Sequence, residues 1–194
     1  MPDTRYAQAL AAIDALHAED PARDPSGEPG ELVYARRMSA RLEGLHPDAS
    51  EVLRLAVRCQ HLQRWKLRRE DYPAGPVGYR RWRTDEAAAH AAAAAEALAQ
   101  AGYEAMTIAR IQSLVRKENL RSDPEAQALE DTSCLVFLEH YLADFARKHP
   151  EAKLVDILAK SWRKMSPAAR EAALALPLDP AHRTLIARAL EKTT

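Results

Sequence analysis

Apolar residues recur at spacings of three and four along most of the chain, which is the period of an amphipathic α-helix. The first such stripe joins Leu10, Ile13 and Leu16, and either Asp3 or Thr4 can cap the helix that carries it. No segment alternates with the two-residue period of a β-strand over a useful length. The pattern therefore predicts an all-α fold.

The same apolar period, together with capping residues and with prolines and glycines that end helices, gives the approximate positions of the later helices. Helices are predicted from about residue 31 to 45, from Ser50 through Leu62, from Thr84 or Asp85 to Gly102, around residues 108–115, from Asp123 through residues 129–149, and as three shorter helices from Glu151. Prolines and glycines predict a loop over residues 71–78. A chain of 194 residues can form one well-buried core, so the expectation is a single compact helical domain over residues 1–194.

Composition narrows the possible partners. The 28 Lys and Arg residues balance 28 Asp and Glu residues, so any electrostatic attraction must be local. The longest apolar run is rich in alanine and is interrupted by His90 and Glu96, which predicts no membrane span. Cys59 and Cys134 show no metal-type spacing, and residues 1–10 do not resemble a secretion signal. We therefore expect reduced thiols and a cytoplasmic location.

One segment departs from this balance. From Arg54 to Arg83 there are nine basic residues and two acidic ones, together with two tryptophans and two tyrosines. A guanidinium group binds phosphate or carboxylate with two parallel hydrogen bonds, and aromatic rings stack on the organic part of a ligand. The segment thus predicts one wall of an anion-binding pocket. The candidate ligand-binding residues are Arg64, Trp65, Arg69, Tyr72, Tyr79, Trp82 and Arg83, with His90 and Lys117 from later helices. The alternative is structural: the arginines form ion pairs and the rings cover the core.

Candidate acid–base groups lie on two helices. Glu130 and Asp131 are adjacent within an apolar helix, so one of them is expected to point toward the core and to need a cationic partner or a metal. His61 is the natural acid–base candidate, oriented by either carboxylate. The carboxylates could equally form a structural ion pair, and His90 could equally be a satisfied core residue.

Several motifs together resemble the domain-of-unknown-function family 4202. They are ELVYARRM, HLQRW, the Arg69–Pro73 step, GYRRWR, Gly102–Tyr103, Lys117 and QALEDTSCLVFLE, and the later WRKMS segment also fits. The matching motifs span roughly residues 30–145. This resemblance implies no particular activity.

The helix order is also similar to that of the HD-domain phosphohydrolases, which hold a divalent metal through histidines and aspartates. The resemblance implies an HD-like core over about residues 30–145 and a helical extension over about 151–194. Tyr34 stands where the first histidine would fall, His61 takes the place of the His-Asp pair's histidine, and Leu62 replaces its aspartate. Asp131, or Glu130 beside it, takes the late aspartate's place. His61 and Asp131 are the remaining candidate metal ligands, and this reduced shell favours no metal over one divalent metal.

We therefore expect a divergent HD-like protein that binds, and as a phosphohydrolase would hydrolyse, a phosphorylated or nucleotide-like small anion. A second hypothesis is a non-catalytic metabolite sensor or a protein-interaction adaptor. A third is RNA binding through residues 54–83, which the neutral net charge disfavours.

Overall fold

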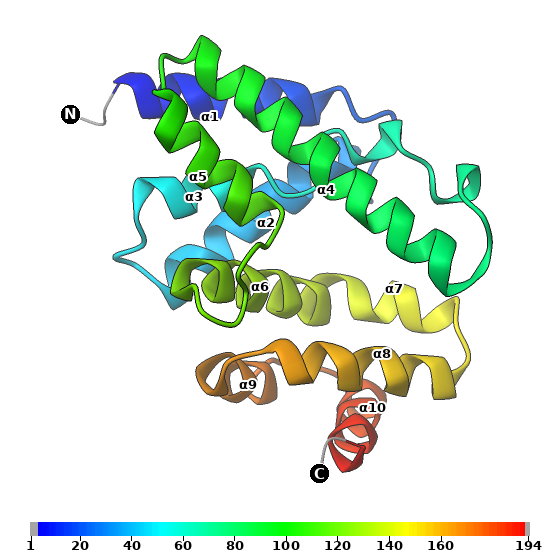
Figure 1. The fold of residues 1–194 in the computed structure, drawn as a ribbon. Coiled ribbons are helices and arrows are strands. Elements are labelled where there is room, and N and C mark those ends of the chain that lie inside the picture. The colour runs from blue at the N-terminus through cyan, green and yellow to red at the C-terminus, as the bar shows by residue number, and fades with distance from the viewer. Residues whose placement is uncertain (1–3, 193–194) are drawn as a thin grey trace. The chain divides into compact units, whose positions relative to one another are not determined.

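The computed structural model describes residues 4–192, and within them the named secondary-structure elements are all helices, with no β-strand. This confirms the predicted all-α class. The chain divides into two compact units, residues 1–119 and 120–194. The first holds α1 (Thr4–Ala18), α2 (Gly30–Leu45), α3 (Glu51–Arg58), α4 (Gly75–Gln100) and α5 (Ala105–Val115); the second holds α6 (Pro124–Val136), α7 (Leu142–Arg147), α8 (Glu151–Lys164), α9 (Pro167–Leu174) and α10 (Pro180–Glu191) (Figure 1). The expected cap Asp3 lies outside the described residues.

The core of the first unit follows the predicted apolar stripes. Ile13 of α1, Met38 of α2, Leu55 of α3, Leu98 of α4 and Ile111 of α5 are fully buried. Helix α4 packs along α5, and α3 packs against both α2 and α5 (Figure 1). No described helix is both long enough and apolar enough to cross a bilayer.

Side-chain caps fix where two helices of this unit, α3 and α2, begin. The side chain of Ser50 accepts a hydrogen bond from the Leu53 amide and opens α3. Buried Asp20 accepts from the amides of Ala22 and Glu31, so a side chain eleven residues upstream serves as the cap for α2.

The segment between α3 and α4 differs from the expected structure. Helix α3 ends at Arg58 instead of continuing through Leu62, and the chain then turns sharply, with φ of 61° at His61 and 57° at Gln63. Left-handed backbone at a residue with a side chain costs about 1–3 kcal/mol and must be held by its surroundings. A helix continued through this segment would place Arg54, Arg58, His61 and Trp65 on one flank, and the turn after Arg58 rules that arrangement out.

Helix α4 begins at Gly75, nine residues before the predicted cap Thr84. Pro76 occupies its first turn, where a missing amide hydrogen breaks no helical hydrogen bond. The loop predicted over residues 71–78 is therefore helix from Gly75 onward. Two 3₁₀ turns, η1 (Arg64–Lys66) and η2 (Arg69–Asp71), fill the connection. This loop folds back on α4 so closely that a Cβ at Gly78 would lie 1.9 Å from the carbonyl oxygen of Pro73.

The second unit begins with the predicted Asp123–Pro124 start, where the Asp123 side chain accepts from the amides of Glu125 and Ala126. Helices α6 and α7 are joined without a break by a π-helical segment, Phe137–Tyr141. The three expected shorter helices follow as α8, α9 and α10, and α10 packs on α8. Ser166 and Asp179 cap α9 and α10 with their side chains.

Candidate functional site

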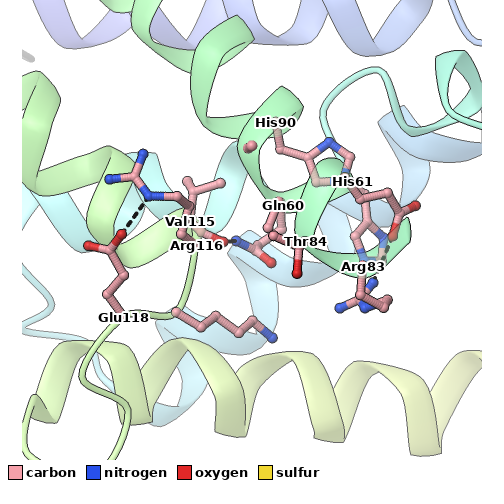
Figure 2. Close-up of a pocket in the computed structure, with 12 residues that line it drawn as sticks. Gln60, His61, Arg83, Thr84, His90, Val115, Arg116 and Glu118 are labelled. Atoms are coloured by element: carbon pink, nitrogen blue, oxygen red, sulfur yellow. Dashed lines mark hydrogen bonds and ion pairs between the residues drawn. The ribbon is translucent and has the colours of Figure 1, made fainter. Parts of the chain in front are cut away.

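A cavity of about 370 Å³ opens in the first unit between the turn after α3, the middle of α4 and the end of α5. Its polar lining includes Gln60, His61, Arg83, Glu86, His90 and Lys117. Figure 2 shows His61 and His90 at the same end of the cavity as Arg83, while Arg116 and Glu118 pair with one another at the other end. Of the residues that the sequence singled out, the cavity brings together His61, Arg83, His90 and Lys117.

His61 is held in place from several sides. Its ring stacks on Tyr34 of α2 with centroids 4.3 Å apart and 12° between the planes. Nη1 of Arg64 lies 3.2 Å from its Nδ1, and Oε2 of Glu31 lies 3.7 Å from the same nitrogen. Burial, reinforced by the positive charge of Arg64, holds the pKa of His61 well below its usual value. His61 is therefore a neutral imidazole at pH 7, able to accept a proton or a hydrogen bond.

His90 is a second neutral imidazole, only 5% exposed, whose ring centroid lies 6.0 Å from that of His61. Its Nδ1 lies 2.7 Å from the carbonyl oxygen of Leu62. Burial lowers the pKa of His90 to about 4, so the ring carries one proton at pH 7. Because a carbonyl can only accept, that proton sits on Nδ1. The buried Nε2 has a lone pair and no hydrogen-bond partner among the described residues.

Glu86 organises the cationic side of the cavity. Its side chain is 1% exposed, and it receives Arg64 Nε at 3.1 Å and Arg83 Nη1 at 2.9 Å. Burial raises the pKa of this carboxyl, while the two guanidinium groups oppose that rise. Both arginines also lie near the face of Trp82, with Cζ 5.7 and 5.8 Å from the ring centroid. Two permanent cations thus share one carboxylate, which leaves the cluster with a positive excess.

Glu31 is a member of the site that sequence reasoning missed. It lies one turn before Tyr34 on α2 and is four-fifths buried beside His61. Burial raises the pKa of Glu31 to about 7, with Arg64 opposing the shift and Asp20 and Glu86 adding to it. Position 31 is within ELVYARRM, three residues before Tyr34, and that helical spacing is the signal that would have indicated it. Sequence reasoning also missed Glu86, which its helical spacing of four residues before His90 would have indicated.

Lys117 reaches the cavity from the end of α5. The helix ends at Val115, and Lys117 then adopts φ of 56°. As at His61, a residue with a side chain takes up left-handed backbone next to the cavity. Gln60 completes this wall by donating from its amide to the carbonyl oxygen of Val115 at 3.3 Å.

Other residues of the cationic segment secure the loop before α4. Arg69 donates to the carbonyl oxygens of Tyr72 and Pro73, and the Tyr72 hydroxyl donates to Asp85 at 3.0 Å. Trp82 donates from Nε1 to the carbonyl oxygen of Leu67 at 3.0 Å. These bonds favour the structural alternative for all three residues, and their predicted contact with a ligand stays a prediction.

The remaining aromatic candidates lie nearer the surface. Tyr79 is 51% exposed, with its ring centroid 5.7 Å from that of Trp82, and Trp65 is half-buried in η1. Neither lines the cavity, and their predicted stacking on a ligand also stays a prediction.

Replacing Trp82 with phenylalanine should lower the free energy of unfolding by about 1–2 kcal/mol, because the Leu67 carbonyl loses its donor in a part-buried position. Tyr79→Phe, which alters an exposed ring edge, should change it by less than about 0.5 kcal/mol. Urea unfolding of both variants measures the difference. Equal stabilities would mean that the indole hydrogen bond does not hold the loop.

Glu130 and Asp131 are both buried in α6, at 5% and 4% exposure. Within the second unit, Lys164 Nζ lies 3.4 Å from Glu130 Oε1. Asp131 Oδ1 accepts from the Gln127 side chain and from the Ser166 amide, both at 2.9 Å. Asp131 therefore ties α6 to the start of α9. Their catalytic role and their predicted orientation of His61 stay predictions.

A protein metal site needs several His, Cys, Asp or Glu side chains grouped together. No three His, Cys, Asp or Glu side chains in residues 4–192 are grouped as metal ligands would be. His61 belongs to the first unit and Asp131 to the second, and their role as metal ligands stays a prediction. Cys59 and Cys134 are free and buried, and burial raises the pKa of the Cys59 thiol to about 12.

Comparison with known proteins gives one match. The family described as Domain of unknown function (DUF4202) matches residues 7–186, which covers both units. No curated protein and no solved structure matches the chain.

Proposed function

The chain belongs to the DUF4202 family, and we propose that its first unit binds a small phosphorylated or nucleotide-like anion in the cavity beside His61. The observation that carries the proposal is the positive excess around Glu86, which is one carboxylate shared by Arg64 and Arg83. Lys117 adds its positive charge to that of Arg83 in the lining, whereas Arg116 of the lining is paired with Glu118. The ion pair engages only one nitrogen of the Arg83 fork, and its side chain is 42% exposed. The guanidinium can therefore bind a phosphate oxygen without leaving Glu86.

The neutral state of the two histidines also supports this ligand. Imidazolium groups would add charge, but they would also cost desolvation energy in a buried wall. Neutral rings instead place hydrogen-bond acceptors beside the cations at the end of the cavity where Arg83 lies. Pockets of 300–1000 Å³ with a few converging polar groups are typical sites for small molecules.

Arg83→Gln should weaken the binding of phosphate monoesters at least about tenfold, because one charge-assisted hydrogen bond contributes about 1.5–3 kcal/mol. The probes are AMP and inorganic phosphate, titrated calorimetrically. Arg81→Gln is the matched control, since Arg81 lies on the same helix, is 75% exposed and pairs only loosely with Asp85 at 3.9 Å. We expect it to bind within about twofold of the parent protein. If the parent protein does not bind either probe at millimolar concentration, or if the two variants bind equally, the proposed site is wrong.

Hydrolysis of the bound ester is a second candidate, favoured by the Glu31–His61 pair. In this reaction water forms a bond to phosphorus, the ester P–O bond breaks, and one proton passes from water to the leaving alcohol. A neutral imidazole 3.7 Å from a carboxyl group whose pKa is about 7 can accept and return that proton near neutral pH. The HD-like arrangement belongs to this proposal, and the stacking of Tyr34 on His61 supports it. Release of inorganic phosphate from AMP or p-nitrophenyl phosphate tests it.

Binding without turnover would instead support a metabolite sensor or an adaptor. RNA binding would show as a steep loss of affinity with salt on a single-stranded RNA probe. The cytoplasmic location expected from the sequence stays a prediction.

A further inference from the structure

His90 presents an acceptor that the protein does not use. Its Nδ1–H donates to the Leu62 carbonyl oxygen, which fixes both the ring and its tautomer. Its Nε2 is therefore a lone pair, buried and without a partner among the described residues. A buried acceptor left unpaired costs about 1–3 kcal/mol, so such atoms call for an explanation.

The explanation is in the cavity, because His90 is 95% buried and yet lines it. A molecule that enters the cavity can reach His90 Nε2, which accepts no hydrogen bond from the described residues. Arg64 and Arg83 are oriented toward Glu86, at 3.1 and 2.9 Å. A group bound in the cavity can supply the donor that His90 lacks.

A second acceptor lies on the same face of α4. Glu86 is one helical turn before His90 and also lines the cavity. Its buried Oε1, although 3.1 Å from Arg64 Nε, accepts no hydrogen bond of good geometry. The wall formed by α4 thus offers two acceptors, whereas the phosphate group proposed above requires donors.

From these two buried acceptors beside a cationic cluster, we infer that the ligand is a sugar phosphate, whose hydroxyl groups donate to His90 Nε2 and Glu86 Oε1 while its phosphate binds Arg83 and Lys117. This inference rests on the proposed anion binding and adds the chemical identity of the ligand's organic part. A hydroxyl group supplies the donor that an acceptor needs and keeps a lone pair of its own. An alkyl chain in the same place would leave His90 Nε2 unpaired, and sites built around buried polar groups reject such analogues strongly.

The test compares two probes of equal charge and similar length, ribose 5-phosphate and n-pentyl phosphate, with inorganic phosphate as the reference. Calorimetric titration of the unaltered protein should give at least about tenfold tighter binding of ribose 5-phosphate than of pentyl phosphate. His90→Phe should reduce that preference to under about threefold, because the ribose hydroxyl group loses its acceptor.

His17→Phe is the matched control, because His17 is also buried and bonded to a backbone carbonyl, that of Arg58 at 2.9 Å, but does not line the cavity. It should keep the preference for ribose 5-phosphate. Circular dichroism checks that each variant is folded, and the comparison of probes on the unaltered protein needs no variant.

The outcomes separate the two proposals. If inorganic phosphate binds but ribose 5-phosphate and pentyl phosphate bind equally, the sugar inference is overturned and anion binding stands. A preference that survives His90→Phe also overturns the role given to His90. If inorganic phosphate and both esters fail to bind, anion binding itself is overturned.

Discussion

Arg58→Met should lower the free energy of unfolding by about 3 kcal/mol, because it leaves a part-buried carboxylate without its partner. Nε and Nη2 of Arg58 each donate to the Asp14 carboxylate at 2.7 Å, and Nη1 donates to Ser39 Oγ at 3.1 Å. The Arg58 side chain is only 11% exposed, whereas Asp14 is 32% exposed. The estimate therefore lies at the lower end of the 3–5 kcal/mol typical of a broken buried pair. Methionine retains the stem's packing, so the loss reports mainly on the guanidinium group.

Arg36→Met on α2 is the control for removing an arginine as such. Arg36 pairs with Glu28, but both side chains are about half exposed, so its replacement should cost less than about 1 kcal/mol. The double variant Asp14→Leu with Arg58→Met should recover part of the lost stability, because it removes the orphaned carboxylate. Similar stabilities for Arg58→Met and Arg36→Met would show that the α1–α3 tie contributes nothing beyond a surface pair. Urea unfolding followed by circular dichroism gives all four values.

Arg58 also shows why the sequence identified the right segment but not the roles within it. Along the chain, Arg58 and Arg83 are equivalent members of a basic cluster. In the fold, Arg58 ties α1, α2 and α3 together, and Arg83 borders a cavity. The difference depends on which acidic residue each arginine meets, and Asp14 is 44 residues from Arg58. Local spacing contains no information about a pairing at that separation.

Helices could be predicted because their apolar period is local. The boundaries that failed, at the end of α3 and the start of α4, lie where tertiary contacts override propensity. Nothing in HLQRW indicates that His61 and Gln63 adopt positive φ, since neither is glycine. That turn, however, is what brings His61 onto Tyr34 and next to Glu31. The acid–base part of the site therefore depends on strained backbone that a helical pattern cannot reveal.

Glu31→Gln should stabilise the protein at alkaline pH by as much as about 3 kcal/mol, with a gain that vanishes toward pH 4.5. The pKa of Glu31 rises from 4.5 to about 7 on folding, chiefly because the carboxylate loses solvent. Between these values the folded protein binds a proton that the unfolded chain has released, so its stability falls as pH rises through this window. Above about pH 7 both states are ionised and the full penalty, about 1.4 kcal/mol for each unit of the shift, persists.

Glutamine is neutral at every pH and keeps the backbone amide that donates to Asp20, so it avoids the penalty without undoing the cap of α2. His61 and His90 are present in both proteins, so beyond the titration of Glu31 itself only its coupling to the neighbouring His61 adds to the difference. Glu28→Gln, at an exposed position three residues earlier, should show no gain that grows between pH 5 and pH 8. Urea unfolding at pH 5 and at pH 8 measures the free energy of unfolding of each variant relative to the parent protein. If the advantage of Glu31→Gln is the same at both, Glu31 is ionised at pH 5 and cannot share a proton with His61. A gain that grows from pH 5 to pH 8 would mean that the folded protein keeps a protonated carboxyl beside a neutral imidazole at pH 5, the pairing on which the hydrolytic proposal depends.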